Sequence, residues 1–206
     1  MHLKLPAQRA FKVARVARAL APFGDREPRL VTGRALAYRG RARLAWREGV
    51  VGYRAARRRS LVEASDCAVL LPVLEATLPR LGALGLVGEG EAHLALREGR
   101  PVVQLRTHAA QPPAVYAALE AAVGAEGLAG AELHIAGTAA TFGQPEERRA
   151  GPDGEPLTAP LGGFAQAHAE LEPQLARAVV DAAEPAGRRV LELFAGHGLL
   201  TVGLAA

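Results

Sequence analysis

The sequence predicts an α/β protein in which a central mixed α/β domain is followed by the opening of a second α/β domain. Three observations carry this prediction. Short segments between residues 36 and 107 alternate apolar and polar residues, which is typical of antiparallel strands. Residues 73–84 and 112–123 have the spacing of helices. The apolar run 190–194 leads into a glycine turn, like the first strand of a doubly wound sheet.

The first 136 residues alternate short elements of both kinds. Residues 7–20 are expected to form an amphipathic helix, because apolar residues recur near the helical period with arginines opposite them. Pro22 and Gly24 end this helix. The later elements are expected to be strands over 34–46, 50–57 and 60–65, a helix over 73–84, strands over 91–97 and 101–107 joined by a turn at 98–100, a helix over 112–123 and a strand over 132–136.

A change of composition divides the sequence. Residues 143–163 hold five glycines and four prolines, which predicts a loop or linker with one short strand near Leu157. We therefore expect a first domain over 1–150, a linker over 151–163 and the start of a second domain over 164–206. In that second domain we expect a helix over 165–183, a strand over 189–194, a glycine turn at 195–198 and the first turns of a helix.

Basic residues are concentrated in the first third of the chain. Residues 1–60 hold 16 Lys and Arg against three acids, a balance of +13, whereas residues 61–206 hold nine against 18, a balance of −9. Such a local excess is the electrostatic signature of a partner with repeated negative charges, which favours a nucleic acid backbone. We expect the run Arg57, Arg58 and Arg59 to contact it. A merely solvated arginine-rich face is the alternative.

Several classes of protein are excluded or disfavoured. A single cysteine, Cys67, forms no internal disulfide and no complete metal site. The tract 190–206 is 17 residues long and contains Glu192 and His197, so it falls short of the roughly 18 to 20 apolar residues of a membrane span. No secretory signal opens the chain, so a cytoplasmic location is expected. We also expect a monomer with no membrane partner. No G-x-S-x-G elbow of a serine hydrolase occurs.

The glycine turn is the most informative segment. Gly196 and Gly198 allow a tight turn and close approach of a ligand, and the helix that follows offers free N–H groups. A dinucleotide fingerprint would need glycine where Thr201 stands, and no Gly-Lys-Ser/Thr of a P-loop follows. Glu192 followed by Phe194-Ala-Gly-x-Gly resembles the first motif of S-adenosylmethionine-dependent methyltransferases. A strand–turn–helix unit without a cofactor is the alternative.

A second motif lies upstream of this turn, in Gly163-Phe164-Ala165-Gln166-Ala167-His168. Together the two motifs resemble the RNA uracil 5-methyltransferase family, which modifies ribosomal and transfer RNA. The likeness extends to Pro6-Ala7-Gln8, Val51-Gly52-Tyr53-Arg54, Asp66-Cys67-Ala68-Val69-Leu70 and Gly90-Glu91-Ala92-His93-Leu94. It implies a fragment: a central α/β domain that faces RNA, followed by the start of a Rossmann-like methyltransferase domain that is incomplete.

The resemblance also implies roles for individual residues. Phe164 would pack against the flipped uracil, and Gln166 would bind the cofactor. A core aromatic and a solvated glutamine are the alternative interpretations. The methionine part of S-adenosylmethionine would lie among Glu192, Phe194, Gly196 and Gly198.

Other positions depart from the family pattern. Cys67 stands at the position of an iron–sulfur ligand whose three partner cysteines are absent, so a small core residue is the better interpretation. His168 replaces an asparagine, and Ala68 a proline. The family's catalytic cysteine and base are missing, so no catalytic residue is assigned and this chain alone is expected to be inactive. Two alternatives stay open: a non-catalytic RNA-binding module, and a methyltransferase with a substrate other than RNA.

Overall fold

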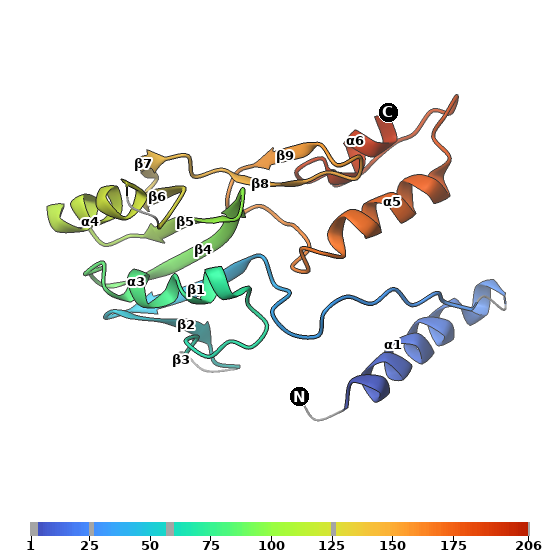
Figure 1. Cartoon of the computed structure of the whole chain (residues 1–206), viewed down its shortest axis with the longest axis horizontal. Helices are drawn as coiled ribbons and strands as arrows, with labels where there is room; N and C mark the ends of the chain where they lie inside the picture. The colour runs from blue at the N-terminus through green and yellow to red at the C-terminus, as the bar shows by residue number, and fades with distance from the viewer. Residues whose placement is uncertain (1–3, 25–26, 57–59, 125–126, 206) are drawn as a thin grey trace. The chain divides into compact units, whose positions relative to one another are not determined.

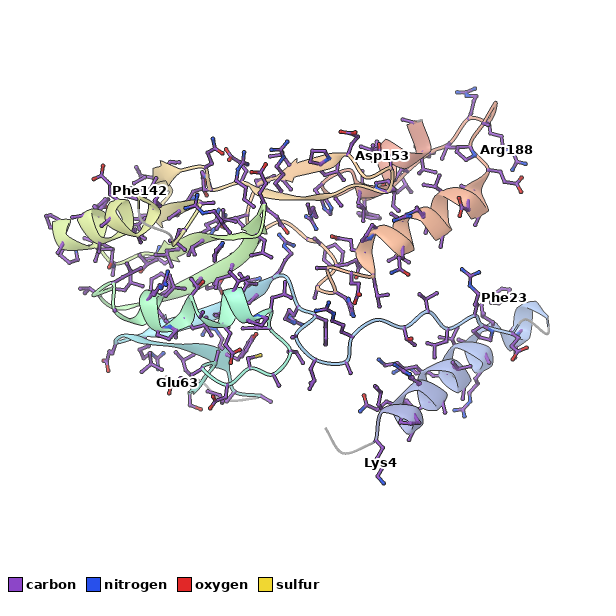
Figure 2. All side chains as sticks on the ribbon, viewed as in Figure 1. Lys4, Phe23, Glu63, Phe142, Asp153 and Arg188 are labelled. Carbon is purple, nitrogen blue, oxygen red and sulfur yellow. The ribbon has the colours of Figure 1, made fainter. Side chains whose placement is uncertain are left out.

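The computed structural model describes residues 4–24, 27–56, 60–124 and 127–205, which form two compact units divided after Ala35 (Figure 1). The first unit contains helix α1 (Leu5–Leu20) and a short 3₁₀ helix, η1 (Ala21–Phe23). Pro6 lies in the first turn of α1, where its missing N–H has no intrahelical partner to lose. The predicted N-terminal helix is confirmed, and Figure 2 labels Lys4 and Phe23 near its ends.

The second unit is built on a nine-stranded mixed sheet (Figure 1). Seven strands lie in the order β3-β2-β1-β4-β5-β6-β7, and β8 pairs with β4 and β9. Neighbours are antiparallel except for β5–β6 and β4–β8. The strands are β1 (Ala42–Arg47), β2 (Val50–Arg54), β3 (Leu61–Glu63), β4 (Glu89–Arg97), β5 (Arg100–Thr107), β6 (Gly130–Ile135), β7 (Thr138–Gly143), β8 (Glu147–Ala150) and β9 (Pro156–Ala159).

Tight turns set the register of the sheet. Glu98 and Gly99 join β4 to β5, and Ala136 and Gly137 join β6 to β7, with positive φ at all four residues. Two successive residues of positive φ make the turn type that matches the twist of a hairpin. The predicted hairpin at 98–100 is therefore confirmed. The strand β7 was not predicted.

Helices cover one face of the sheet and enclose its core. These helices are α2 (Pro72–Glu75), α3 (Leu78–Gly82) and α4 (Pro113–Gly124), and α4 connects the parallel strands β5 and β6. Trp46 is the largest buried side chain, at 1% exposure. The core around it includes Leu44, Leu70, Leu74, Leu81, Leu94, Val103, Leu105, Val115, Leu119 and Leu133. Phe142 on β7, labelled in Figure 2, contacts Tyr116 of α4. The centroids of the two rings are 6.5 Å apart.

The opposite face of the sheet is polar, because alternate residues of each strand point away from this core. Arg43 pairs with Glu91 on the neighbouring strand, and Gln104 Nε2 donates to Glu132 at 2.7 Å. Only a small apolar cluster lies on this side, where Leu161 packs against Ala95 and Val102.

Several predicted elements differ from the structure. The helix expected over 73–84 is two short helices, α2 and α3, because Pro79 has no N–H to continue the hydrogen-bond ladder. Of the strand expected over 34–46, only β1 forms, and Arg39 makes isolated bridges instead. The strand near Leu157 is confirmed as β9, although its partner β8 was not predicted.

The last part of the chain contains two helices, α5 (Glu172–Ala183) and α6 (Leu199–Ala205). The first was expected over 165–183, but it begins only at Glu172, just before Pro173. The helices pack closely, since a Cβ on Gly203 would lie 2.7 Å from Val180. Across the described residues, no helix combines the length and apolar character that a membrane crossing requires.

Candidate functional site

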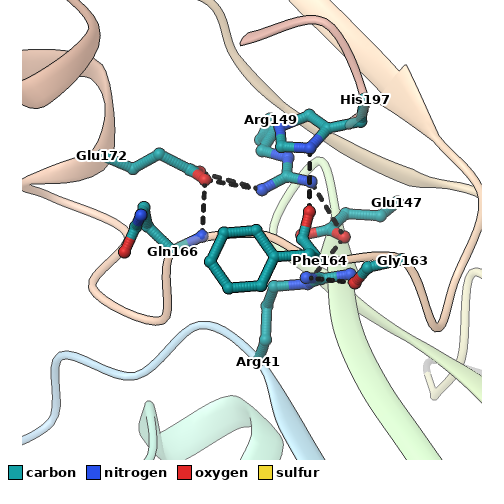
Figure 3. Close-up of polar contacts among 8 residues, drawn as sticks. All are labelled: Arg41, Glu147, Arg149, Gly163, Phe164, Gln166, Glu172 and His197. Carbon is teal, nitrogen blue, oxygen red and sulfur yellow. Dashed lines mark hydrogen bonds and ion pairs between the residues drawn. The ribbon is translucent and has the colours of Figure 1, made fainter. Parts of the chain in front are cut away.

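Four charged residues from separate parts of the sequence form a buried cluster (Figure 3). Arg41 precedes β1, Glu147 and Arg149 lie two residues apart on β8, and Glu172 begins α5. Arg41 Nε lies 2.8 Å from Glu147 Oε2. Arg149 donates to both oxygens of Glu172, at 2.8 and 3.0 Å, and its Nη2 lies 3.5 Å from Glu147. We call these four residues the charged cluster.

Burial governs the electrostatics of the charged cluster. The side chains of Glu147 and Glu172 are 5% and 4% exposed. Burial raises the pKa of Glu147, against the opposite effect of Arg41 and Arg149. Burial likewise lowers the pKa of Arg41, although Glu147 opposes this change. Because removal of one partner would weaken the pairing of a buried charge, each member of the cluster stabilises the others.

The charged cluster holds the loop that contains the upstream motif. Arg41 Nη1 donates to the carbonyl of Gly163 at 3.0 Å. Glu172 Oε1 accepts from the backbone N–H of Gln166, also at 3.0 Å. The loop 163–166 is thereby fixed at both ends by buried charges.

His197 connects this loop to the glycine turn. Its Nδ1 donates to the carbonyl oxygen of Phe164 at 3.0 Å (Figure 3). Its Nε2 is buried and has no hydrogen-bond partner among the described residues. Burial lowers the pKa of His197, and the nearby Arg149 adds to this effect. A neutral imidazole, with its proton on Nδ1, is therefore the form that holds the two motifs together near neutral pH.

The side chains of Phe164 and Gln166 are exposed and do not belong to the apolar core. Phe164 is 78% exposed, and its ring stands beside the charged cluster while its carbonyl turns toward His197 (Figure 3). Gln166 is also exposed, and its backbone rather than its side chain is engaged with Glu172. An exposed aromatic ring on a fixed backbone is suited to stacking on a base.

The glycine turn has the backbone that its sequence predicts. Gly196 and Gly198 have φ of +62° and +84°, in the left-handed region where glycine is favoured. A Cβ on either residue would meet nothing closer than 3.8 Å, so the space beside the turn is open. Glu192 Oε2 accepts from Thr201 at 2.6 Å. The turn, the carboxylate and the start of α6 are therefore close together.

The strand expected over 189–194 does not form. No element among the described residues pairs with this segment, and a strand needs a partner to satisfy its N–H and C=O groups. Leu191, Leu193 and Phe194 are consequently exposed, and Phe194 is at φ +60° with its side chain fully in solvent. The sequence pattern was typical of a buried strand, and the missing partner explains the difference.

Cys67 packs against the apolar core and not against the two motifs. It is partly buried against the apolar core, and its Sγ lies 3.8 Å from Tyr53 Oη. Burial raises the pKa of Tyr53 to about 12, and the Cys67 contact adds to this effect. Within the described ranges, no three His, Cys, Asp or Glu residues gather as a metal site. The residues described here do not fit an iron–sulfur cluster.

The predicted RNA contacts are only partly described. Arg57, Arg58 and Arg59 lie outside the described residues. Arg43 and Arg47 lie on β1, where they pair with Glu91 and Glu89 of the adjacent strand. These acids reduce the positive charge that the sequence assigned to this surface.

The fold resembles one part of a known enzyme. A solved structure of the Pyrococcus abyssi tRNA (uracil-54, C5)-methyltransferase, in complex with S-adenosyl-L-homocysteine, superposes with a TM-score of 0.77 and 17% sequence identity. The match covers 99% of this chain and 54% of that protein, so the chain spans about half its length. No family model and no curated protein sequence matches the chain. The comparison establishes the fold alone.

Proposed function

We propose that this chain is part of an RNA methyltransferase: its RNA-facing domain and the first portion of its cofactor-binding domain. The reaction would transfer a methyl group from S-adenosylmethionine to carbon 5 of a uridine in ribosomal or transfer RNA. One observation carries the proposal. The 163–166 loop and the glycine turn, which the sequence presents as separate motifs, are joined by the His197–Phe164 hydrogen bond of 3.0 Å. The fold likeness to a tRNA (uracil-54, C5)-methyltransferase supports it independently.

The residues of this chain would bind and orient the reactants. The exposed ring of Phe164 would stack on the target uracil, and the free amide of Gln166 would contact the cofactor. Gly196 and Gly198 would line the methionine part, and Phe194 would lie beside it. Glu192 uses only Oε2 toward Thr201, so Oε1 is available to an ammonium group. The cofactor would supply an activated methyl group.

Methylation of carbon 5 also needs chemistry that we do not assign to this chain. A nucleophile must add to carbon 6 of the uracil, which makes carbon 5 able to accept the methyl group. A base must then remove the proton from carbon 5 while the nucleophile leaves carbon 6, so that the double bond re-forms. Cys67 does not serve as this nucleophile in our proposal, because it packs against the core beside Tyr53 rather than beside Phe164. The contribution of the described residues is therefore positioning.

Binding measurements on the full chain test this proposal. We expect S-adenosylhomocysteine to bind in calorimetry and a fluorescent oligouridine to bind in anisotropy. Phe164→Ala should weaken RNA binding by about 5- to 150-fold, because stacking on an aromatic contributes roughly 1–3 kcal/mol per base. It should leave cofactor affinity unchanged. Phe23→Ala is a matched control, since Phe23 is 76% exposed in the other unit. RNA binding that is equally weakened by both changes would contradict the role of Phe164.

A non-catalytic RNA-binding module is the second candidate. The observation that favours it is the contact between Glu192 and Thr201, which already occupies part of the carboxylate that would hold the cofactor. This candidate predicts salt-dependent RNA binding with no affinity for S-adenosylhomocysteine. The same calorimetry separates the two functions.

A further inference from the structure

A hollow of about 320 Å³ lies beside Phe164, between the start of β1, strand β4 and the 161–167 loop. Its wall includes three arginines and one histidine, and none of the described residues that line it is acidic. The lining side chains that matter for binding are Arg39, Arg41, Arg43, His93, Leu161 and Phe164. Three arginines therefore lie next to an exposed aromatic ring, and one of them, Arg43, also pairs with Glu91 on the neighbouring strand.

The three arginines differ in their ion pairs and in the exposure of their side chains. Arg41 is committed to Glu147 and to the carbonyl of Gly163. Arg43 donates to a single oxygen of Glu91, at 2.6 and 3.1 Å, and 70% of its side chain remains exposed. Arg39 forms no ion pair with an acid among the described residues. Arg39 is therefore the arginine of the hollow whose charge no carboxylate among the described residues neutralises, although its side chain is only partly exposed; Arg43 is the more exposed of the two.

His93 adds a neutral wall rather than a further charge. It is 8% exposed, and its Nε2 lies 3.6 Å from Glu91. Burial lowers the pKa of His93, and Arg43 adds to the effect. Leu161 and Leu94 complete an apolar floor. The hollow thus combines an apolar wall, a neutral hydrogen-bonding ring and available guanidinium groups.

The backbone of Arg39 is fixed, and its side chain is partly exposed. Its N–H donates to Val69 at 2.8 Å, and it bridges to both Leu70 and His168. The neighbouring Tyr38 stacks on His168 with ring centroids 4.6 Å apart. A rigid backbone that carries a guanidinium without a carboxylate partner is the arrangement that positions a phosphate contact.

We propose that this hollow binds the RNA backbone phosphate adjacent to the uridine on Phe164, with Arg39 as the main contact and Arg43 as the second. This inference rests on the proposed function and assigns it a phosphate subsite. An RNA phosphate fits better than a free phosphate ion, because the exposed ring of Phe164 borders the hollow and, of the described arginines that line it, Arg39 and Arg43 alone lie outside the charged cluster. An attached base that stacks on Phe164 would provide the remaining contact.

The salt dependence of RNA binding by the full chain tests this subsite. The probe is a fluorescent oligouridine of about twelve nucleotides, a length that covers one single-strand site. Loss of one phosphate contact reduces the slope of log K against log[salt] by about 0.7 for a single strand. Arg39→Gln should show this change and bind about three- to tenfold more weakly at low salt, whereas Arg39→Lys should retain the slope. Arg80→Gln is the matched control, because Arg80 is an exposed arginine on α3, which packs on the helical face.

The outcomes separate this inference from the proposed function. A reduced slope in Arg39→Gln, with Arg80→Gln like the wild type, supports the subsite. RNA binding with an unchanged slope in Arg39→Gln overturns the subsite and leaves the proposed function intact. Absence of RNA binding by the wild type overturns both. Inorganic phosphate, added at constant ionic strength, should not displace the oligouridine. If phosphate does displace it, and Arg39→Gln abolishes that effect, the hollow is a site for free phosphate and the assignment to an RNA phosphate is overturned.

Discussion

Replacing Glu172 with alanine should remove the acceptor that holds α5, β8 and the 163–166 loop together. Its oxygens accept two hydrogen bonds from Arg149, at 2.8 and 3.0 Å, and one from Gln166 N–H at 3.0 Å. Breaking one side of a buried ion pair costs about 3–5 kcal/mol. Arg149 keeps a second acid, Glu147, at 3.5 Å, so we expect the lower end, a loss of about 3 kcal/mol in the free energy of unfolding.

Urea denaturation measures this loss directly. Trp46 is the single tryptophan and is 1% exposed, so its fluorescence reports unfolding of the sheet. Glu184→Ala is the control: its ion pair with Arg188 is 61–70% exposed and should contribute less than about 1 kcal/mol. Glu172→Gln, which keeps the shape and one acceptor, should fall between the two. A shift of the midpoint in Glu172→Ala no larger than in Glu184→Ala, at equal slopes, would refute the reasoning.

Three further changes test other parts of the structure. Gly198→Ala forces a Cβ into φ +84°, so it should cost about 1 kcal/mol in urea denaturation and weaken S-adenosylhomocysteine binding; unchanged calorimetry would contradict a cofactor role for the turn. Because burial lowers the pKa of His197, the imidazole binds a proton in the unfolded chain before it does so in the folded one, as the pH falls below about 6.5. The free energy of unfolding should therefore fall more between pH 7.5 and 5.5 in the wild type than in His197→Asn. Equal losses in the two proteins would contradict this expectation. Gly90→Ala places a Cβ 2.4 Å from the Trp46 ring, so it should lower the free energy of unfolding by about 1–3 kcal/mol and alter Trp46 fluorescence. An unchanged spectrum and an unchanged urea midpoint would show that the site can relax.

The elements that sequence patterns predicted well are those with local signals. The hairpin between β4 and β5 follows from Glu98-Gly99, because the residues of the turn themselves set its geometry. β7 was missed because the segment 138–143 is rich in small residues and shows no clear apolar alternation. The opposite error occurred at 189–194, where the apolar pattern is strong but a strand depends on a neighbour that the segment itself cannot supply.

Sequence motifs indicated the loop and the turn of the candidate site, but they did not indicate the ion pairs of the charged cluster. Phe164 and the glycines of the turn were identified from short patterns. The charged cluster was not, because Arg41 and Glu172 have no sequence neighbours that mark them as buried. A weak signal exists in Glu147 and Arg149, which lie two residues apart on a strand and so share one face. The sequence does not show that this face is covered.

The charged cluster explains why the loop with Phe164 has a definite position at all. Leu161 is buried, but Phe164 and Gln166 are exposed, so apolar packing fixes only the start of this loop. Buried ion pairs contribute less to stability than apolar packing of the same volume, yet their hydrogen bonds are directional. Arg41 and Glu172 each direct one such bond to the loop backbone. The stability of the charged cluster and the placement of the exposed ring therefore depend on the same contacts.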